Sequence, residues 1–528
     1  MSVLDTIRAA AWNAGQSFVT TIDSNAFIMQ VNDIATRGCV FQVPLLEDNV
    51  EQLSGSIGFP VDQLKCIFGL LVTYPLSILF VRLPPGVLRH AFSLFFGLFL
   101  MQFVFGSDWI HCAVASIGTY LLAALLPARI SPYAVMLFAM GYLTACHIYQ
   151  QSAHWMSWRV DFTGPMMVLT IKLTSFAFNY ADGASAPARA NLDSAIEAAQ
   201  RAAKTGNDRR AVAKLKALQT QKQLSLDSLP SPLAFLGYTF CYAGLLGGPA
   251  SEMRDYLQAC EGSGASGEYN RKHGHAPTAG WLPLWLLLQS FGWAFAFQWG
   301  GARFPTSTLY SPEFIEMPLW HRTAQYLICM FFTRAKYYFV WLMAEGANLL
   351  GGFGYVGGDK DAWRGARNID IWGMETHKSV SEASRAWNQK TQTWLERYTY
   401  NRTGGSLLAT YFVSAFWHGF YPGYYIFFIG FAIGTMAQRK LKAILRPMFV
   451  PAGAEKPTMV WNALSLIVGT TYVNFLACAF VMQDIGRIGA FFSAFHFIPF
   501  VVVFAILLLV PKPRRGGQKT KDKKTKAQ

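Results

Sequence analysis

Charged residues are scarce in this sequence. Asp, Glu, Lys and Arg make up 14% of the 528 residues, against about 25% in soluble globular domains. Hydrophobic residues reach 52% and aromatic residues 15%. This composition excludes disorder, fibrous repeats and an ordinary soluble enzyme. Repeated apolar runs of about 20 residues predict a polytopic membrane protein, because each is long enough to cross the hydrocarbon layer.

Several motifs typical of other protein classes are also missing. Residues 1–30 lack a basic stretch followed by an uninterrupted apolar core, so we expect no cleavable signal peptide. The eight cysteines include no pair two to four residues apart, which argues against zinc and thioredoxin-type sites. Neither Gly-x-Ser-x-Gly nor Gly-x4-Gly-Lys occurs, and no histidine has an Asp five residues later. No metal site and no resident cofactor are expected.

The positive charge is concentrated in loops. The net charge is +15, and residues 511–528 contain eight Lys or Arg against one Asp. Smaller basic excesses lie in 182–230 and in 439–446. In a membrane protein such loops obey the positive-inside rule and face anionic lipid. We therefore expect a cytosolic C-terminal tail, membrane lipids as partners and no nucleic-acid partner.

The apolar segments predict an all-α polytopic membrane protein with about eleven transmembrane helices, give or take two, plus re-entrant or interfacial helices. The eighth apolar segment (318–352) and the ninth (405–437) are longer than one crossing needs. Each can be a tilted helix, a helix pair or a helix with a re-entrant piece. The segments span approximately residues 61–83, 86–106, 109–127, 131–150, 163–181, 231–249, 280–300, 318–352, 405–437, 459–482 and 489–510.

This pattern divides the chain into an N-terminal, partly amphipathic segment (1–60), a transmembrane domain (61–510) and a basic tail (511–528). Three polar stretches interrupt the transmembrane domain. The first can be a solvated helix or a flexible loop, and the second reads as an irregular loop. The third mixes charges with seven Trp and Tyr residues, which is typical of an interfacial segment that folds back into the protein. They are residues 183–230, 251–279 and 353–404.

Histidines are the first candidates for chemistry. His418 lies in an apolar run with no charged residue between Gly405 and Arg439. Ionisable groups in such runs are costly and hence functional candidates, and a neutral imidazole can accept a proton near neutral pH. A histidine bonded between helices is the alternative, which position alone does not exclude. His147 and His154, seven residues apart near a membrane boundary, can share a helix face.

Asn388 is a second candidate, at the end of the aromatic and charged segment. An amide does not titrate, but it can donate to a developing oxyanion or orient a substrate carbonyl. The alternative is an ordinary helix cap or surface amide, which spacing alone favours.

Four segments of the sequence, in the same order along the chain as in the family, resemble the membrane-bound O-acyltransferase (MBOAT) family. Two carry the general resemblance, and two sharpen it towards the lysophospholipid acyltransferase branch, most like the fungal, broad-specificity type. Together they cover roughly residues 60–510. The segments are Trp387-Asn-x2-Thr-x2-Trp-Leu395 with Tyr400-Asn-Arg402, then Phe416-Trp-His-Gly419, Asp161 to Ser175 leading to Asn179 and Asp182-Gly183, and Phe235 to Pro249 leading to Tyr256.

The resemblance implies a helical bundle with an internal tunnel. The implied reaction transfers a fatty acyl group from acyl-CoA, a co-substrate, to the free, mainly sn-2, hydroxyl of a lysophospholipid. His418 and Asn388 would be the catalytic pair. A homodimer is left open. The residues expected to contact substrate are Trp387, Thr391, Trp394, Trp417 and Arg402.

Other functions remain open at this point. A lipid transporter or an inactive membrane scaffold shares the apolar spans, and related acyltransferases act on sterols, diacylglycerol or proteins. The segment from Asp161 argues against those other acceptors. The chain ends Lys524-Thr-Lys526-Ala-Gln528, which resembles a dilysine retrieval signal of the endoplasmic reticulum. A basic tail drawn to anionic lipid is the alternative.

Overall fold

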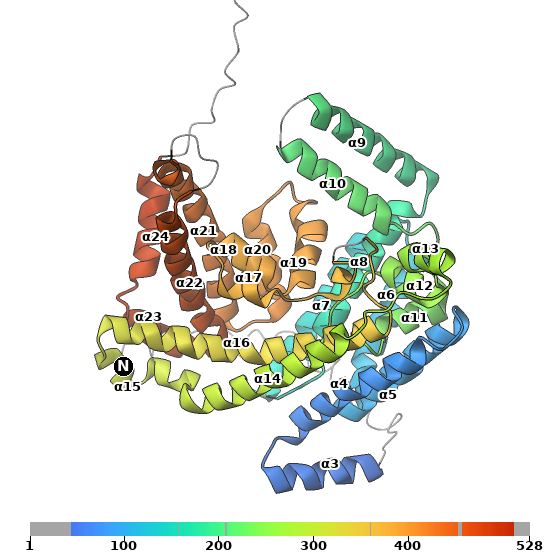
Figure 1. The fold of residues 1–528 in the computed structure, drawn as a ribbon, viewed down its shortest axis with the longest axis horizontal. Coiled ribbons are helices and arrows are strands. Elements are labelled where there is room, and N and C mark those ends of the chain that lie inside the picture. The colour runs from blue at the N-terminus through green and yellow to red at the C-terminus, as the bar shows by residue number, and fades with distance from the viewer. Residues whose placement is uncertain (1–43, 158, 206–208, 359–360, 452–456, 512–528) are drawn as a thin grey trace, which may run out of the picture.

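The computed structural model describes residues 44–511 except 158, 206–208, 359–360 and 452–456. Within this part of the chain all regular structure is helical (Figure 1). The predicted all-α class is therefore confirmed. Most of the predicted N-terminal segment (1–43) and nearly all of the basic tail (512–528) lie outside the described residues.

The first helices form a bundle around the largest buried apolar cluster. Leu143, Leu169 and Phe176 are fully buried there. The apolar face of each helix packs on its neighbours, with α7 on α8 and α6 on both. The helices are α3 (Pro44–Ile57), α4 (Val61–Phe80), α5 (Val87–Phe105), α6 (Trp109–Leu125), α7 (Ser131–Ala153) and α8 (Thr163–Gly183).

The first polar stretch is helical. It forms α9 (Ala186–Thr205) and α10 (Arg209–Leu224), which pack on one another and project from the bundle (Figure 1). Lys222 and Asp193 form an exposed ion pair between them, at 2.6 Å. Of the two predicted alternatives, the solvated helix is correct.

The predicted crossing over 231–249 is wrong. Its helix, α11 (Pro232–Thr239), has eight residues and is about 12 Å long, too short to span the hydrocarbon layer. The apolar residues that follow, such as Phe240 and Tyr242, are buried against the protein instead of facing lipid. Hydropathy does not distinguish these two environments.

The second polar stretch is also more regular than predicted. Residues 251–279 contain two short helices, α12 (Met253–Glu261) and α13 (Gly264–His273). Each ends at a glycine with a positive φ, Gly262 and Gly274, the left-handed conformation that commonly ends helices. The expectation of an irregular loop there is wrong.

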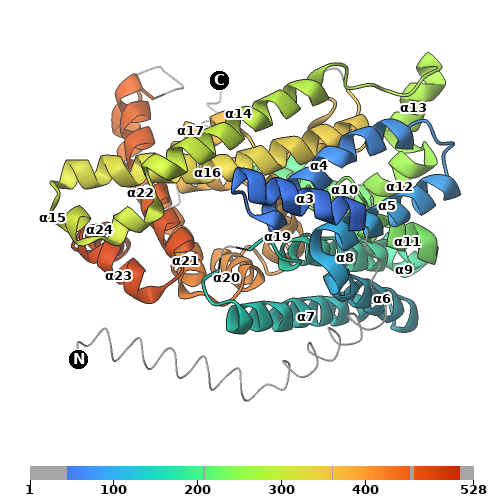
Figure 2. The same cartoon turned by 90° about the horizontal axis from the view of Figure 1, so that it is seen from below.

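Two long helices run side by side along one edge of the molecule (Figures 1 and 2). They are α14 (Leu282–Arg303) and α16 (Leu319–Leu350), joined through the short α15 (Pro312–Glu316). The 32 residues of α16 extend about 48 Å, more than one perpendicular crossing needs. The eighth apolar run is thus one continuous helix.

The ninth apolar run is a helix pair. α20 (Leu407–His418) and α21 (Pro422–Leu445) are separated at Gly419, and they pack on each other. The chain continues through α22 (Met459–Met482) and then through α23 (Ile485–Ser493) and α24 (Ile498–Leu509), which are bent by 80° relative to one another.

Length and apolar composition identify four helical stretches of the described chain that can cross a membrane, or five if the bent pair α23 and α24 is one span. The protein is therefore an integral membrane protein. This measure does not confirm eleven crossings, and that number stays a prediction.

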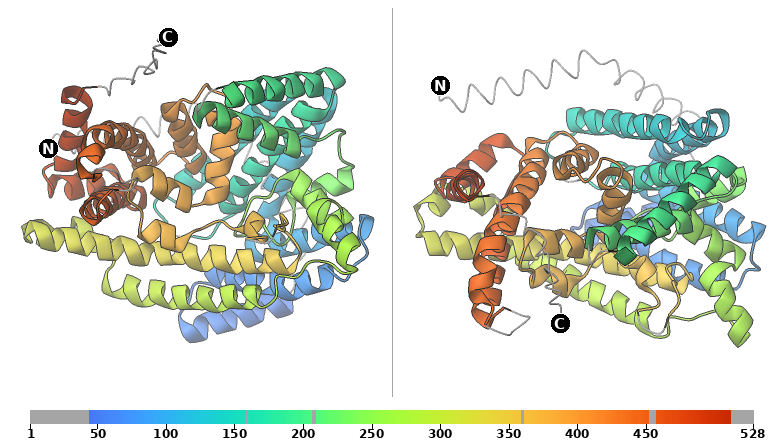
Figure 3. Two further views of the ribbon diagram at one scale, coloured as in Figure 1. Left: turned by 45° about the horizontal axis from the view of Figure 1, so that its top comes forward. Right: turned by 90° about the horizontal axis from the view of Figure 1, so that it is seen from above.

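The third polar stretch folds back into the centre of the molecule, and its predicted place at the membrane interface stays a prediction. Its helices α17 (Ile371–Glu375), α18 (Val380–Ala386) and α19 (Gln389–Leu395) lie between α16 and the helices α20 to α22 (Figures 1 and 3). α19 contacts both α8 and α20, and it continues into a π-helical turn, η4 (Glu396–Tyr400).

Candidate active site

His418 is the last residue of α20, and one of its ring nitrogens has a fixed partner. Nδ1 lies 2.7 Å from the carbonyl oxygen of Ser414, one turn earlier. Because a carbonyl only accepts, Nδ1 carries the proton, and Nε2 of the neutral ring is the acceptor. The side chain keeps part of its surface exposed. This tautomer is the one that a general base needs.

Aromatic rings surround the imidazole of His418. The ring centroids of Phe428, Phe480 and Tyr424 lie 4.7, 5.4 and 5.8 Å from it. The Tyr424 hydroxyl in turn accepts a 2.7 Å hydrogen bond from the Gln483 amide. The imidazole is therefore held from α21 and α22 as well as from its own helix.

Asn388 precedes α19 in a backbone conformation that few side chains adopt. Its φ is 41° and its ψ 58°, in the left-handed region, where Asn is several-fold enriched among residues other than glycine. Its side chain does not cap the helix. Asn368 caps the helix instead: its carbonyl and its Oδ1 accept from the backbone of Gln389 and Lys390 at 2.7 and 3.1 Å. The Asn388 amide thus has no helix-capping role.

Trp387 anchors the backbone next to Asn388. Its ring lies against three aromatic side chains of α16, with centroids 4.9 Å away for Trp341, 5.3 Å for Tyr337 and 6.0 Å for Tyr338. Trp387 therefore sets the position of Asn388 relative to α16, whether or not it also contacts substrate.

A partly buried ion pair attaches the third polar stretch (353–404) to the same helix. Arg334 of α16 donates from Nε and Nη2 to the two carboxylate oxygens of Glu375, at 3.0 and 2.7 Å. Tyr338 also donates to Glu375, and Asn474 of α22 accepts from Arg334. The pair and its partners thus join α16, α17 and α22.

Three other residues predicted to contact substrate already have partners within the protein. Trp394 and Trp417 are 1% and 4% exposed, and their indole N–H groups donate to Thr174 Oγ1 and to the Met167 carbonyl, both at 3.0 Å. Arg402 pairs with Asp182 at 2.7 Å. Thr391 is buried and Trp387 half-buried. Substrate contact by these residues stays a prediction.

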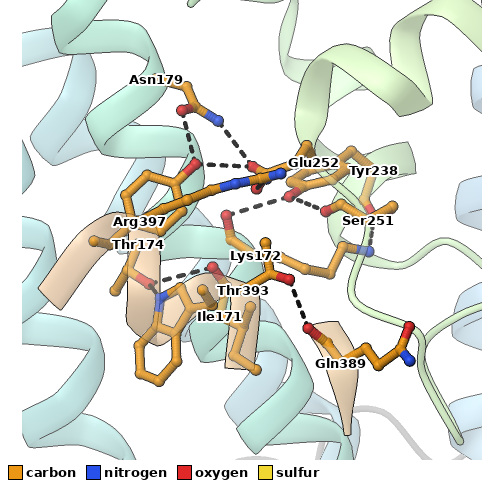
Figure 4. A network of polar contacts seen from close by, with 12 residues as sticks. Ile171, Lys172, Thr174, Asn179, Tyr238, Ser251, Glu252, Gln389, Thr393 and Arg397 are labelled. Carbon is orange, nitrogen blue, oxygen red and sulfur yellow. Dashed lines mark hydrogen bonds and ion pairs between the residues drawn. The ribbon is translucent and has the colours of Figure 1, made fainter. Parts of the chain in front are cut away.

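Sequence reasoning missed a polar network centred on Glu252 (Figure 4). This carboxylate accepts from Asn179 Nδ2 at 2.9 Å and from Arg397 Nη1 at 2.7 Å. The Tyr398 hydroxyl lies 2.8 Å from Asn179 Oδ1 and 3.1 Å from Glu252. The network joins α8, the start of α12 and the π-helical turn after α19. The only signal in the sequence was the resemblance of the segments around Asn179 and Pro249, which assigned no role to Glu252.

Two further charged groups, Lys390 of α19 and Asp255 of α12, interact with each other. Burial lowers the pKa of the Lys390 ammonium and raises the pKa of the Asp255 carboxyl, and each charge partly offsets the shift of the other. Both side chains nevertheless keep surface open to solvent. Among the described residues, no three His, Cys, Asp or Glu side chains group closely enough to hold a metal ion.

The candidate residues are thus a histidine whose Nε2 is the acceptor nitrogen and an amide with no capping role, both in the helical scaffold of an integral membrane protein. An imidazole acceptor and an amide donor are groups that can take part in acid–base chemistry. Residues 147–481, well over half of the chain, match the profile of MBOAT, the membrane-bound O-acyltransferase family. The chain belongs to this family.

Curated relatives are similar along most of this chain. "Lysophospholipid acyltransferase 2" of Arabidopsis thaliana is 29% identical over 481 residues, covering 87% of this chain and 96% of the relative. Human "Membrane-bound glycerophospholipid O-acyltransferase 1" is 28% identical, covering 88% and 93%. "Lysophospholipid acyltransferase" of Schizosaccharomyces pombe is 27% identical, covering 89% and 91%.

Proposed function

We propose that this protein is a lysophospholipid acyltransferase, which transfers a fatty acyl group from acyl-CoA to the free, mainly sn-2, hydroxyl of a lysophospholipid. The family and the names of relatives that align along most of the chain support the reaction class. The observation that carries the chemistry is the bond from His418 Nδ1 to Ser414, because it directs the proton-accepting Nε2 away from its own helix.

In the proposed reaction His418 acts as the general base. The lysophospholipid hydroxyl attacks the thioester carbonyl carbon while Nε2 takes the hydroxyl proton. The tetrahedral intermediate then collapses, the C–S bond breaks, and the proton returns from the imidazolium to the CoA thiolate. General-base catalysis of this kind contributes about 10² to 10⁴ in rate, and no acyl-enzyme is needed.

Asn388 stabilises the oxyanion of the intermediate or holds the thioester carbonyl. Its amide is free of the capping role, and its backbone is held by Trp387 on one side and by Asn368 on the other. A single oxyanion donor is worth about 10² to 10³ in rate when it is preorganised. The contacts on both sides of Asn388 support such preorganisation because they fix its backbone.

We also propose that the protein resides in the endoplasmic reticulum with its tail in the cytosol. Arg439, Lys442 and Arg446 line a hollow of about 660 Å³ at the end of α21. Lys440 in this same stretch donates to the carbonyl of Leu507 at 2.6 Å, so the last helix ends beside this basic cluster. Basic loops face the cytosol, which supports the same side for the tail that follows.

A direct assay tests the function. Purified protein in phospholipid nanodiscs is incubated with labelled oleoyl-CoA and, separately, with lysophospholipids of different head groups, a sterol and diacylglycerol. Labelled phospholipid and free CoA in equal amounts are expected from the lysophospholipids. Product only from sterol or diacylglycerol would assign another acceptor, and no product from any of them would favour a transporter or a scaffold.

A further inference from the structure

His147 of α7 contacts the backbone on both sides of His418. Its Nε2 lies 3.1 Å from the carbonyl oxygen of Trp417. Its ring also lies against Gly419, where an added Cβ would be 3.5 Å from Cγ of the imidazole. The residues before and after His418 therefore rest on the same side chain.

The two contacts of His147 lie at the C-terminal end of α20, where the backbone carbonyls lack hydrogen-bond donors within the helix. The last carbonyls of a helix have no donor four residues ahead within the helix, and α20 ends at His418. Gly419 then leaves the helix with a φ of 117°, which side chains other than glycine rarely adopt. The Nε2–H of His147 supplies a donor to one of these carbonyls, at Trp417.

The chain just after α7 holds the next residues of the same turn. The backbone N–H of Met156 donates to the Tyr421 hydroxyl at 3.0 Å, and the rings of Trp155 and Tyr421 lie 5.1 Å apart. Residues 147–156 thus contact both the end of α20 and the turn that leads into α21. The position of the His418 ring depends on this contact because its own helix ends there.

We propose that His147 is a positioning residue for His418, and this inference rests on the proposed acyl transfer. Its Nε2–H bond to Trp417 holds the last turn of α20, so that Nδ1 of His418 stays on Ser414 and Nε2 faces the substrate. The bond to a carbonyl requires the proton of His147 on Nε2. His147 acts as a donor in this arrangement and takes no proton from the substrate.

The variants His147→Phe and His147→Gln separate shape from hydrogen bonding. Phe keeps a planar ring without a donor, while Gln places an N–H near the position of Nε2. We expect His147→Phe to lower kcat by about 100-fold, since a shift of about 1 Å at a reacting group costs that much. KM for acyl-CoA and for lysophospholipid should change less than twofold. His147→Gln should recover most of the lost kcat.

His90→Phe is the matched control for loss of a buried histidine. His90 is 6% exposed, and its Nδ1 lies 3.2 Å from the Tyr256 hydroxyl, away from α20. Its kcat should stay within threefold of wild type, and Tm measured for all variants should show that they are folded. A wild-type kcat in His147→Phe would overturn the proposal. A folded His147→Gln variant that is as slow as His147→Phe would also overturn the proposal, and would favour a proton-transfer role for His147.

A second readout needs no substrate. Diethyl pyrocarbonate modifies exposed neutral imidazoles, and mass spectrometry gives its rate at His418. The rate should rise several-fold in His147→Phe, as the end of α20 frays, and return in His147→Gln. An unchanged rate would contradict positioning even if the wild-type protein transferred no acyl group, so this failure differs from a failure of the proposed function.

Discussion

The indole rings of Trp394 and Trp417 lie 6.0 Å apart, across the contact between α19 and α20. Both indole N–H groups donate to residues of α8, namely Thr174 and Met167. One helix thus holds the two segments that carry Asn388 and His418, which are thirty positions apart in the chain. The relative placement of the two proposed catalytic groups depends on α8.

Replacing His418 should abolish acyl transfer without unfolding the protein. His418→Ala is expected to lower kcat by about 10² to 10⁴, the contribution of a general base. His418→Asn is the sharper variant, since its amide can keep the bond to Ser414 but offers no base. Turnover is measured on purified protein with equal thermal stability. More than a tenth of wild-type turnover in either variant would make His418 a structural residue.

A substitution at Asn388 must be compatible with its left-handed backbone conformation. Ala at a φ of 41° adds strain of about 1–2 kcal/mol, so Asn388→Gly is the control that removes the amide alone. Both should lose about 10² to 10³ in kcat. Asn388→Asp should lose as much, because a carboxylate repels the forming oxyanion. An active Asp variant would exclude the oxyanion role and favour simple positioning.

The Glu252 network should contribute to stability more than to chemistry. Glu252→Gln leaves Arg397 without its carboxylate, and charge-assisted hydrogen bonds of this kind contribute about 1.5–3 kcal/mol. Because the Arg397 side chain is 32% exposed, we expect the lower end of that range and a lower Tm in detergent. In the double variant with Arg397→Gln, the two losses should be less than additive. Additive losses would mean that the pair does not act as a unit.

The sequon Asn401-Arg-Thr403 is the only Asn-x-Ser/Thr site in the sequence, and it should stay unmodified. It lies in the third polar stretch (353–404), which we expect on the cytosolic side or within the protein, away from the glycosylation machinery. Gel mobility before and after endoglycosidase treatment measures this, with an engineered luminal sequon as the positive control. A mobility shift of the protein without the engineered sequon would mean that this segment lies on the luminal side.

Lys524 and Lys526 belong to the part of the tail outside the described residues. If the tail is a retrieval signal, changing both to Ser should let a tagged protein leak to later compartments while specific activity stays the same. Changing Lys519 and Lys521 to Ser removes equal charge and is the control. Retention of the Lys524/Lys526 variant in the reticulum would leave the tail an electrostatic role only.

The candidate site could be reached from the sequence only in part. His418 stands out because an ionisable side chain in an apolar run is rare, and Asn388 because its segment resembles a family motif. Glu252 and Arg397 gave no such signal, and His147 was noted only as a histidine that can share a helix face with His154. Each acts through a partner more than 70 positions away in the chain, and no local pattern reports such a contact.

Composition and the length of the apolar runs were sufficient for the all-helical, membrane-integral character, because hydrophobicity and helical length are local properties of the chain. They were not sufficient for the segment at 231–249, which is equally apolar but is buried in protein. Tertiary structure alone decided that α20 ends at His418, that α8 holds both Trp394 and Trp417, and that His147 contacts the carbonyl of Trp417. Each of these depends on packing between helices distant in sequence, where shape and hydrogen-bond geometry select one arrangement among many with the same hydrophobic pattern.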